Sequence, residues 1–137
     1  DYSGVISLFM KKIQQQQPIT IYGDGYQCRD FIYVTDVVRF LLKAMAKSEK
    51  NADVYNVCTG KATYIKDLAV LCSQALQQPL LPINYTQARL GDIRISVGNP
   101  KKGEQLLGVK ADVGIAEGLN AMVSNSREEE RKMRKQL

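Results

Sequence analysis

The sequence from residue 22 to residue 36 reads Tyr-Gly-Asp-Gly-Tyr-Gln-Cys-Arg-Asp-Phe-Ile-Tyr-Val-Thr-Asp. The β-branched and aromatic run over residues 19–22 predicts a strand, and the Gly-Asp-Gly triplet then supplies the positive φ angles that a tight turn requires. Residues 30–34 predict a second strand, and the closing Thr-Asp pair favours a helix N-terminus. The segment therefore predicts a strand, a turn, a strand and a capped helix.

Arg29 lies between these two predicted strands. A guanidinium held between rigid elements is pre-positioned to offer several N–H donors to a phosphate or a carboxylate, whereas an arginine on a loose loop is usually only solvated. Position, more than residue type, makes Arg29 a candidate binding residue.

The rest of the chain alternates short apolar runs with amphipathic helical patterns, which is typical of an α/β fold. We predict a small sheet with flanking helices. Helices are expected at residues 5–13, 36–47, 65–76, 101–107 and from 115 onward, and further strands at residues 53–57 and 81–85.

The apolar residues of the second helix and of the strands follow different patterns. In the helix expected over residues 36–47, Val38, Leu41, Leu42 and Met45 form an apolar face with 3–4 spacing. The strands are apolar along nearly their whole length, which suits burial on both faces. We therefore expect them to need a sheet supplied by another segment.

Length and composition restrict the class of protein. With 137 residues, 45% of them hydrophobic and 24% charged, the chain fits one soluble domain with a real core. No apolar run reaches the roughly 18 to 20 residues of a membrane span, so we expect no membrane partner. The chain opens on Asp1 rather than Met, from which we expect a fragment or a processed product.

Cysteine and histidine usage excludes several chemistries. Cys28, Cys58 and Cys72 are widely spaced and include no C-x-x-C pair, so neither a disulfide framework nor a zinc site is indicated. A cytoplasmic, reducing location is expected. The chain contains no histidine, which excludes Ser-His and Cys-His catalytic systems and histidine-ligated metals.

The net charge of +5 is not concentrated on a binding surface. The run from residue 127 to residue 135 holds five cations against three anions and carries +2 of the total. The other basic residues are scattered, and no aromatic-interleaved basic strand occurs, so we expect no nucleic-acid partner.

Motifs for nucleotide and cofactor binding are incomplete. A dinucleotide-binding loop needs Gly-x-Gly-x-x-Gly between a strand and a helix, but Cys28 stands where the third glycine should be. No tyrosine is followed four residues later by lysine, so the Tyr-x-x-x-Lys catalytic pair is also absent. Two arginines in turns remain, Arg29 and Arg89, with Asp30 and Asp92 close in sequence. They form either ordinary surface ion pairs or a two-arginine clamp on a diphosphate.

Five motifs follow one another in a fixed order along the chain. They are Pro18-Ile-Thr-Ile-Tyr-Gly-Asp-Gly, Arg29-Asp-Phe-Ile-Tyr-Val-x-Asp-Val-Val, Asp53-Val-Tyr-Asn-Val-x-Thr-Gly, Ala88-Arg-x-Gly-Asp and Glu117-Gly-Leu. In this order they resemble the C-terminal part of NAD-dependent sugar-nucleotide epimerases and dehydratases, the extended short-chain dehydrogenases. The resemblance is strongest to UDP-hexose and UDP-N-acetylhexosamine 4-epimerases, and it runs from Tyr2 to about Val123.

The resemblance implies a UDP-sugar site formed by Thr20, Ile21, Tyr22, Arg29, Arg89, Asp92 and Ser96. The two arginines would hold the diphosphate, and the backbone of the first three residues would pair with the uracil. This assignment agrees with the chemistry, because two guanidinium groups in separate turns can grip a pyrophosphate and a strand edge can pair with a base edge.

The resemblance gives Asp92 and Ser96 roles that remain open. Asp92 is implied either in contact with the ribose or in orienting Arg89. Ser96 stands where the family places a residue against the hexose, and a small side chain there leaves room for an N-acetyl group. That favours a UDP-N-acetylhexosamine, with a small residue at an unremarkable turn as the equal alternative.

The departure from the family is the missing cofactor machinery. Family members hold NAD on a glycine-rich loop and abstract a proton with the Tyr-x-x-x-Lys pair, and this sequence has neither. We therefore expect no cofactor in this chain, NAD being implied only for a full-length relative, and no catalysis by the chain alone. The expected partners are a UDP-sugar and either a missing cofactor domain or a second copy of the chain.

These inferences divide the chain into two parts. We expect residues 1–123 to form the sugar-nucleotide-binding region and residues 124–137 to form a charged C-terminal helix or a frayed tail. In the alternative, the chain is a truncated remnant that acts as a homodimeric interaction or structural module, in which unpaired strands of two copies pair.

Overall fold

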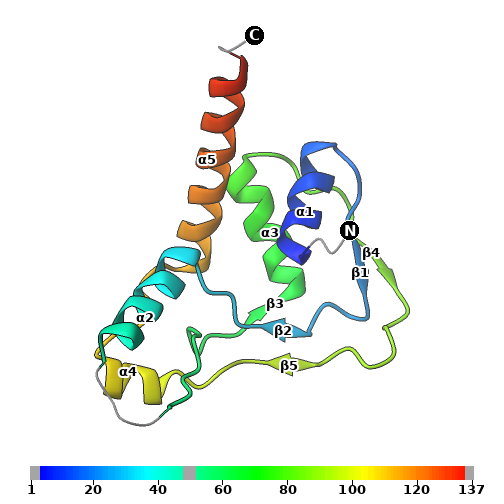
Figure 1. Cartoon of the computed structure of the whole chain (residues 1–137). Coiled ribbons are helices and arrows are strands. Elements are labelled where there is room, and N and C mark those ends of the chain that lie inside the picture. Colours follow the sequence, from blue (N-terminus) through cyan, green and yellow to red (C-terminus); the bar gives the residue numbers. More distant parts are fainter. Residues whose placement is uncertain (1–3, 48–51, 135–137) are drawn as a thin grey trace.

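The computed structural model describes residues 4–47 and 52–134 of the chain. Short strands and flanking helices confirm the predicted α/β class (Figure 1). In chain order the elements are α1 (Val5–Gln14), β1 (Thr20–Tyr22), β2 (Cys28–Arg29), α2 (Val34–Ala46), β3 (Thr63–Tyr64), α3 (Ile65–Leu76), β4 (Asn84–Thr86), β5 (Ile95–Ser96), α4 (Lys101–Leu107) and α5 (Ile115–Arg134).

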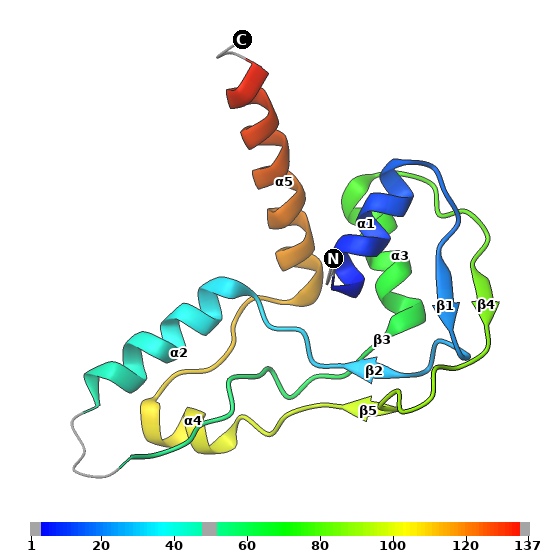
Figure 2. The same cartoon turned by 45° about the vertical axis from the view of Figure 1, so that its right-hand side comes forward.

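The strands form two small sheets (Figure 2). In the first, β1 and β4 are parallel, with Ile21 opposite Tyr85. In the second, β2 lies between β3 and β5, antiparallel to β3 and parallel to β5. This register places Arg29 between Thr63 and Ser96, so the candidate arginine lies on the central strand.

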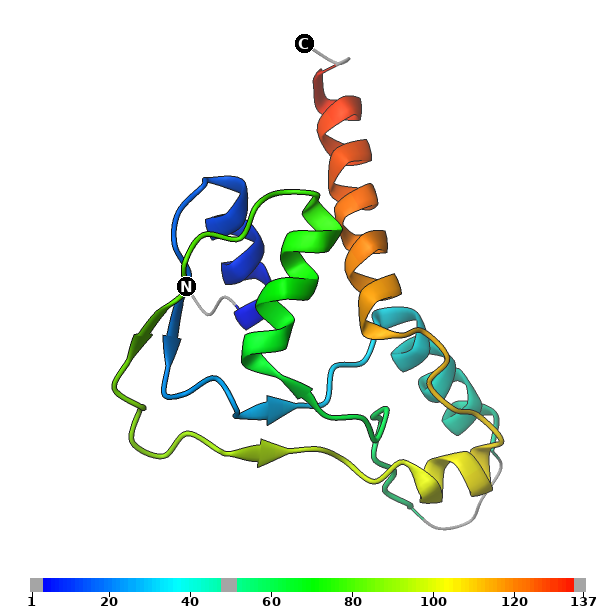
Figure 3. The ribbon, with the colours of Figure 1, turned by 180° about the vertical axis from the view of Figure 1, so that it is seen from behind.

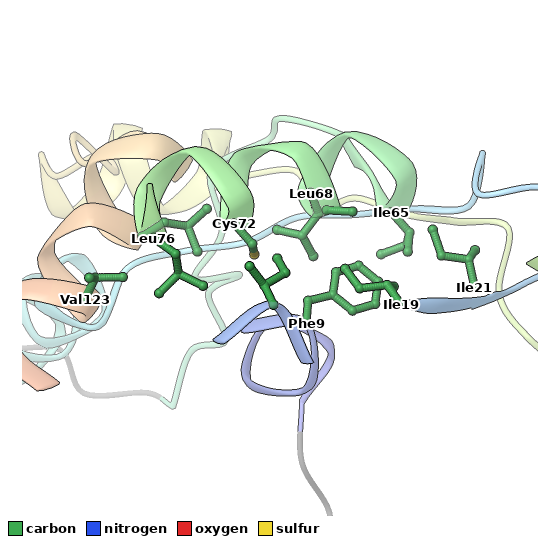
Figure 4. Packing of buried hydrophobic residues seen from close by; sticks show 11 residues of the cluster. Phe9, Ile19, Ile21, Ile65, Leu68, Cys72, Leu76 and Val123 are labelled. Carbon is green, nitrogen blue, oxygen red and sulfur yellow. The ribbon is translucent and has the colours of Figure 1, made fainter. Parts of the chain in front are cut away.

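The main hydrophobic core lies between α1, α3, α5 and β1 (Figure 4). The α3 residues that the helical pattern places inward are all buried, as predicted: Ile65, Leu68, Ala69, Cys72 and Leu76. They pack in one cluster with Phe9 of α1 and Ile21 of β1. Full burial of such a side chain contributes about 1.5–3 kcal/mol, so this cluster holds β1 firmly against the two helices.

A smaller core joins α2 to α4. It contains Phe40, Leu107 and Val109. Beside it, the fully buried carboxylate of Asp36 accepts hydrogen bonds from the backbone N–H groups of Asp112 and Val113 at 3.1 and 2.9 Å, and from Arg39 Nη1 at 2.9 Å. The prediction that Thr35 and Asp36 cap the helix is therefore wrong. Asp36 lies in the first turn of α2 and ties that helix to the segment before α5.

The apolar face predicted for α2 points away from both cores. The helix itself is confirmed, but Leu41 and Leu42 are 53% and 60% exposed, and Met45 is 81% exposed. The buried side of α2 is that of Phe40, because α4 packs there. We call Val34, Val38, Leu41, Leu42 and Met45 the exposed α2 face.

Two of the predicted strands are absent. Residues 30–33 and 53–57 have no strand conformation, so the predictions of strands at 30–34 and 53–57 are wrong. The chain leaves the sheet at Asp30, whose carboxylate accepts the backbone N–H groups of Thr59, Gly60 and Gly98. Residues 53–57 have no neighbouring strand among the described residues, and an extended apolar run needs such a neighbour to form a sheet.

The remaining predicted elements are present with small shifts. The strand expected at 81–85 is β4 at Asn84–Thr86, and α4 ends at Gly108 in the left-handed conformation, with φ 63°. α5 continues as one helix to Arg134 and projects away from the rest of the chain (Figure 1), so residues 124–134 are helical. The division of the chain at residue 123 stays a prediction. Within the described ranges, none of the helices has both the length and the apolar character that crossing a membrane requires.

The contact between Gly98 and Cys58 gives a stability prediction. A Cβ atom at position 98 would lie 2.5 Å from Cys58 Sγ and 2.8 Å from Cys58 Cβ. We expect Gly98→Ala to lower the free energy of unfolding by about 1–3 kcal/mol, because overpacking forces the backbone to shift. Chemical denaturation measures this value.

Two further variants control the experiment. Gly114→Ala should be close to neutral, because a Cβ at Gly114 meets no atom within 4 Å. The double variant Cys58→Gly/Gly98→Ala should be more stable than the sum of its single variants, because the clash is removed. Additive effects of the two substitutions would contradict the proposed clash.

Candidate functional site

A cavity of about 400 Å³ lies between β1, the first turns of α1 and the connection from β4 to β5. This connection passes the ends of β1 and β2 (Figure 3). The cavity is lined by Val5, Leu8, Phe9, Thr20, Ile21, Tyr22, Gln27, Arg29, Ile65, Arg89, Leu90, Gly91 and Asp92. All of the predicted site residues except Ser96 therefore lie around one space.

One wall of the cavity is a free strand edge. The Ile19 carbonyl and the Gly23 N–H bond to β4 at 2.8 Å each, and β1 has no second strand neighbour among the described residues. Successive residues of a strand turn their backbone groups to opposite edges. The backbone groups of Thr20 and Tyr22 therefore point to the other edge, away from β4.

Gln27 occupies one position on that edge. Its Nε2 donates a 2.7 Å hydrogen bond to the Tyr22 carbonyl, and the residue is only 8% exposed. The Thr20 carbonyl and the Tyr22 N–H remain, so the edge offers one acceptor and one donor side by side. Gln27 was not predicted as a site residue. The period-two alternation of extended chain could have indicated it, since Gln27 lies just before β2, two residues from Arg29, and both line the same cavity.

Arg29 is held by hydrogen bonds on two of its nitrogens. Nη1 donates to the carbonyls of Cys28 and Ile93 at 2.8 and 2.6 Å, and Nη2 donates to Asp92 Oδ1 at 2.6 Å. Asp92 thus pairs with Arg29 rather than with Arg89, which corrects the expectation that it orients Arg89. These bonds fasten residues 92–93 to β2.

Arg89 is held in a different way. Its guanidinium carbon lies 3.9 Å from the centroid of the Tyr22 ring. Within residues 4–47 and 52–134, its side chain makes no hydrogen bond or ion pair. Its N–H donors therefore remain available at the mouth of the cavity.

The remaining charged and small residues of this region lie outside the cavity. Ser96 pairs in register with Arg29 on β5 but does not line the space. Arg94 forms a bidentate pair with Asp24 at 2.7 and 2.9 Å. Hydrogen bonds from Arg94 and from the Tyr26 N–H lower the pKa of Asp24 to about 2. The fork of Arg94 is therefore already occupied by a carboxylate.

The Gly23-Asp24-Gly25 turn does not fit a dinucleotide cofactor. It joins β1 to β2 rather than a strand to a helix. A Cβ at Gly25 would lie 2.9 Å from Lys66 Cβ, so this glycine packs against the start of α3. The close backbone approach that a pyrophosphate needs is blocked there.

Known proteins match most of this chain. The sequence model of the "NAD dependent epimerase/dehydratase family" matches residues 1–58. A putative UDP-glucose 4-epimerase from Methanocaldococcus jannaschii is 35% identical over 122 residues, which are 89% of this chain and 38% of that protein.

Solved structures agree with the sequence matches. The UDP-glucose 4-epimerase of Thermotoga maritima, solved with UDP-glucose, is 32% identical and has a TM-score of 0.84 over 94% of this chain and 41% of its own. MoeE5, solved with UDP-glucuronic acid and NAD, is 29% identical and has a TM-score of 0.84 over 94% of this chain and 43% of its own. The chain thus spans about two fifths of the length of the relatives that it matches.

The hydrogen bonds of Arg29 predict a structural role in addition to any binding role. We expect Arg29→Ala to speed amide hydrogen exchange at residues 89–93 at least about threefold, because the bonds to Ile93 and Asp92 are lost. Hydrogen–deuterium exchange followed by mass spectrometry measures these exchange rates. Arg94→Ala, which removes a more exposed ion pair with Asp24, should leave exchange at residues 89–92 unchanged. Wild-type exchange rates in Arg29→Ala would show that these bonds do not hold the connection.

Proposed function

We propose that this chain, which belongs to the NAD-dependent epimerase/dehydratase family, binds the nucleoside diphosphate of a UDP-sugar in the cavity between β1 and residues 89–92. One observation carries the proposal. Among the described residues, the same cavity has on one side a strand edge with no neighbouring strand and on the other an arginine whose side chain makes no hydrogen bond or ion pair. The strand edge can pair with a base, and the arginine can bind a phosphate.

Base recognition rests on the two free backbone groups of β1. A uracil edge presents the N3–H donor between two carbonyl acceptors, so N3–H can donate to the Thr20 carbonyl while a ring carbonyl accepts from the Tyr22 N–H. Cytosine presents an unprotonated N3, which would face the Thr20 carbonyl with no proton between them. A buried acceptor left unpaired costs about 1–3 kcal/mol. The edge therefore favours uracil over cytosine.

Diphosphate recognition rests on Arg89 and the remaining donors of Arg29. Arg89 has all of its guanidinium N–H groups free of hydrogen bonds within the described ranges. Arg29 spends Nη1 and one N–H of Nη2 on protein oxygens, which leaves Nε–H and a second Nη2–H. Two guanidinium groups against the single carboxylate of Asp92 leave net positive charge for the anion, and the free oxygen of Asp92 can accept from a ribose hydroxyl.

The hexose extends beyond the cavity toward β5. Ser96 lies there, opposite Arg29, and its small side chain leaves space beside it. This supports a UDP-N-acetylhexosamine as the preferred ligand within the class.

Catalysis requires parts that this sequence lacks. Neither Gly-x-Gly-x-x-Gly nor Tyr-x-x-x-Lys occurs in it, and NAD would be supplied by a cofactor domain. The exposed α2 face supports docking of such a domain, because it is apolar and lies outside the two cores. The chain is then the substrate-binding part of an epimerase-like assembly and is inactive alone.

Calorimetric titration of the 137-residue chain with UDP tests the site. We expect Arg89→Ala to weaken binding about 10- to 100-fold, because a hydrogen-bonded charge pair with phosphate contributes about 1.5–3 kcal/mol. Arg94→Ala is the matched control, since it removes one exposed arginine whose fork is already paired with Asp24, and it should bind UDP like the wild type. Equal losses of UDP affinity in Arg89→Ala and Arg94→Ala would mean that Arg89 acts only through the net charge of the chain.

A comparison of bases tests the strand edge. UDP should bind at least about tenfold more tightly than CDP, because in the pose that places N3 at the Thr20 carbonyl only uracil carries a proton on that atom. The same calorimetric titration measures both ligands. Equal affinities would remove the β1 edge from base recognition while leaving the role of Arg89 intact.

A homodimeric module is the second candidate, and the exposed α2 face favours it. A large apolar patch on one helix commonly marks an interaction surface. If two copies pair through it, light scattering at high concentration should give a dimer mass, and Leu41→Lys with Leu42→Glu should return the monomer. Lys11→Glu with Lys12→Glu on α1 serves as the charge-changing control. A monomer at all concentrations would exclude this candidate.

A further inference from the structure

We propose that the aromatic ring of Tyr22 is a positioning group for Arg89, which holds the guanidinium flat so that its N–H donors point at the phosphates. The inference rests on the proposed binding of a nucleoside diphosphate. It gives the side chain of Tyr22 a task separate from that of its backbone N–H.

The stack covers the guanidinium without using its hydrogen bonds. The carbon atom of the group lies 3.9 Å from the ring centroid, which is van der Waals contact for a planar cation over an aromatic face. All five N–H donors of a guanidinium lie in its plane and project outward. A guanidinium that stacks parallel to the ring therefore has one of its faces covered and keeps its N–H edge free for an anion.

The two cavity arginines differ in how they are held. Arg29 is fixed by three hydrogen bonds to protein oxygens, and each of them consumes a donor. Arg89 makes no such bond within the described part of the chain, so the ring is the group that restricts it. An arginine side chain loses up to about 2 kcal/mol of conformational entropy when it is ordered. The stack supplies part of that ordering before the ligand arrives.

The Asp92 N–H donates to the Arg89 carbonyl at 3.2 Å and anchors its backbone, but the residue after Arg89 gives the side chain no packing. The next residue, Leu90, is fully exposed, and Gly91 follows with φ 81°. By contrast, Tyr22 belongs to β1, which pairs with β4 along its length and carries the buried Ile21. Strand β1 thus fixes the position of the Tyr22 ring. The ring in turn restricts the guanidinium of Arg89, whose backbone belongs to the connection between β4 and β5.

Tyr22 has no evident structural duty that would explain its ring otherwise. The residue is 39% exposed, and its hydroxyl makes no hydrogen bond among the described residues. A phenylalanine ring would stack on Arg89 equally well. A leucine of similar bulk would keep an apolar side chain on the strand and lose the cation–π attraction.

Five proteins and two ligands test the proposal. Wild type, Tyr22→Phe, Tyr22→Leu and Tyr22→Leu/Arg89→Ala are titrated with UDP and with uridine, with Arg89→Ala as the reference for the double variant. We expect Tyr22→Leu to weaken UDP binding about three- to tenfold, the size of a partly desolvated cation–π interaction, and Tyr22→Phe to retain it. Uridine, which has no phosphate, should bind wild type and Tyr22→Leu alike. In the Arg89→Ala background, Tyr22→Leu should have no further effect on UDP.

Other outcomes would overturn the proposal. Equal losses for uridine and UDP in Tyr22→Leu would mean that the ring contacts the base, and additive losses in the double variant would mean that the two residues act independently. If Arg89→Ala weakens UDP binding and Tyr22→Leu does not, the positioning role fails while the proposed function stands. If wild type binds no UDP, both fail.

A measurement on the wild-type chain removes dependence on folding of the variants. The guanidinium carbon lies 3.9 Å from the Tyr22 ring centroid, so we expect the protons on the neighbouring Arg89 Cδ to be shifted upfield by the ring current without ligand. Signals at the positions of a solvated arginine would overturn the proposal.

Discussion

The carboxylate of Asp30 holds together the parts on which the rest of the site depends. Its two oxygens accept the Thr59 and Gly60 N–H groups, the Thr59 hydroxyl and the Gly98 N–H. Three segments far apart in sequence therefore meet where β2 ends. This fixes the neighbouring Arg29 on the central strand and fixes β5 beside it, so that the connection carrying residues 89–93 returns to β2 at a defined place.

The two arginines line one cavity but belong to different structural elements. Arg29 is a strand residue whose donors tie the connection to the sheet, and Arg89 belongs to the connection and is stacked on β1. The connection is thus restrained at two places, by Arg29 of β2 at residues 92–93 and by Tyr22 of β1 at Arg89. A cavity of this kind forms only when the two small sheets have assembled, so the proposed nucleotide binding would depend on the stability of the main core.

The sequence predicts well those elements that find their partners inside the chain. α1 and α3 are correct because their apolar periodicity meets buried neighbours, and α4 is correct because Pro100 and Gly108 mark its two ends. The predicted residues Arg29, Arg89 and Asp92 line one cavity. The strands expected at 30–34 and 53–57 failed because a strand needs a neighbour, which no local pattern specifies. The pairing of Asp92 with Arg29 rather than Arg89 depends on how residues 89–93 fold back, and sequence spacing cannot decide between the two.

The exposed α2 face and the cavity lined by Arg29 and Arg89 belong to different parts of the fold. The cavity is built on α1, β1 and α3 in the main core, whereas the exposed α2 face adjoins the smaller core of Phe40, Leu107 and Val109. Asp36 bonds the two regions through residues 112 and 113 rather than through the cavity wall. Covering the α2 face with a cofactor domain or a second copy would therefore leave the cavity wall in place, so the proposed ligand binding and the proposed partner docking can be tested separately.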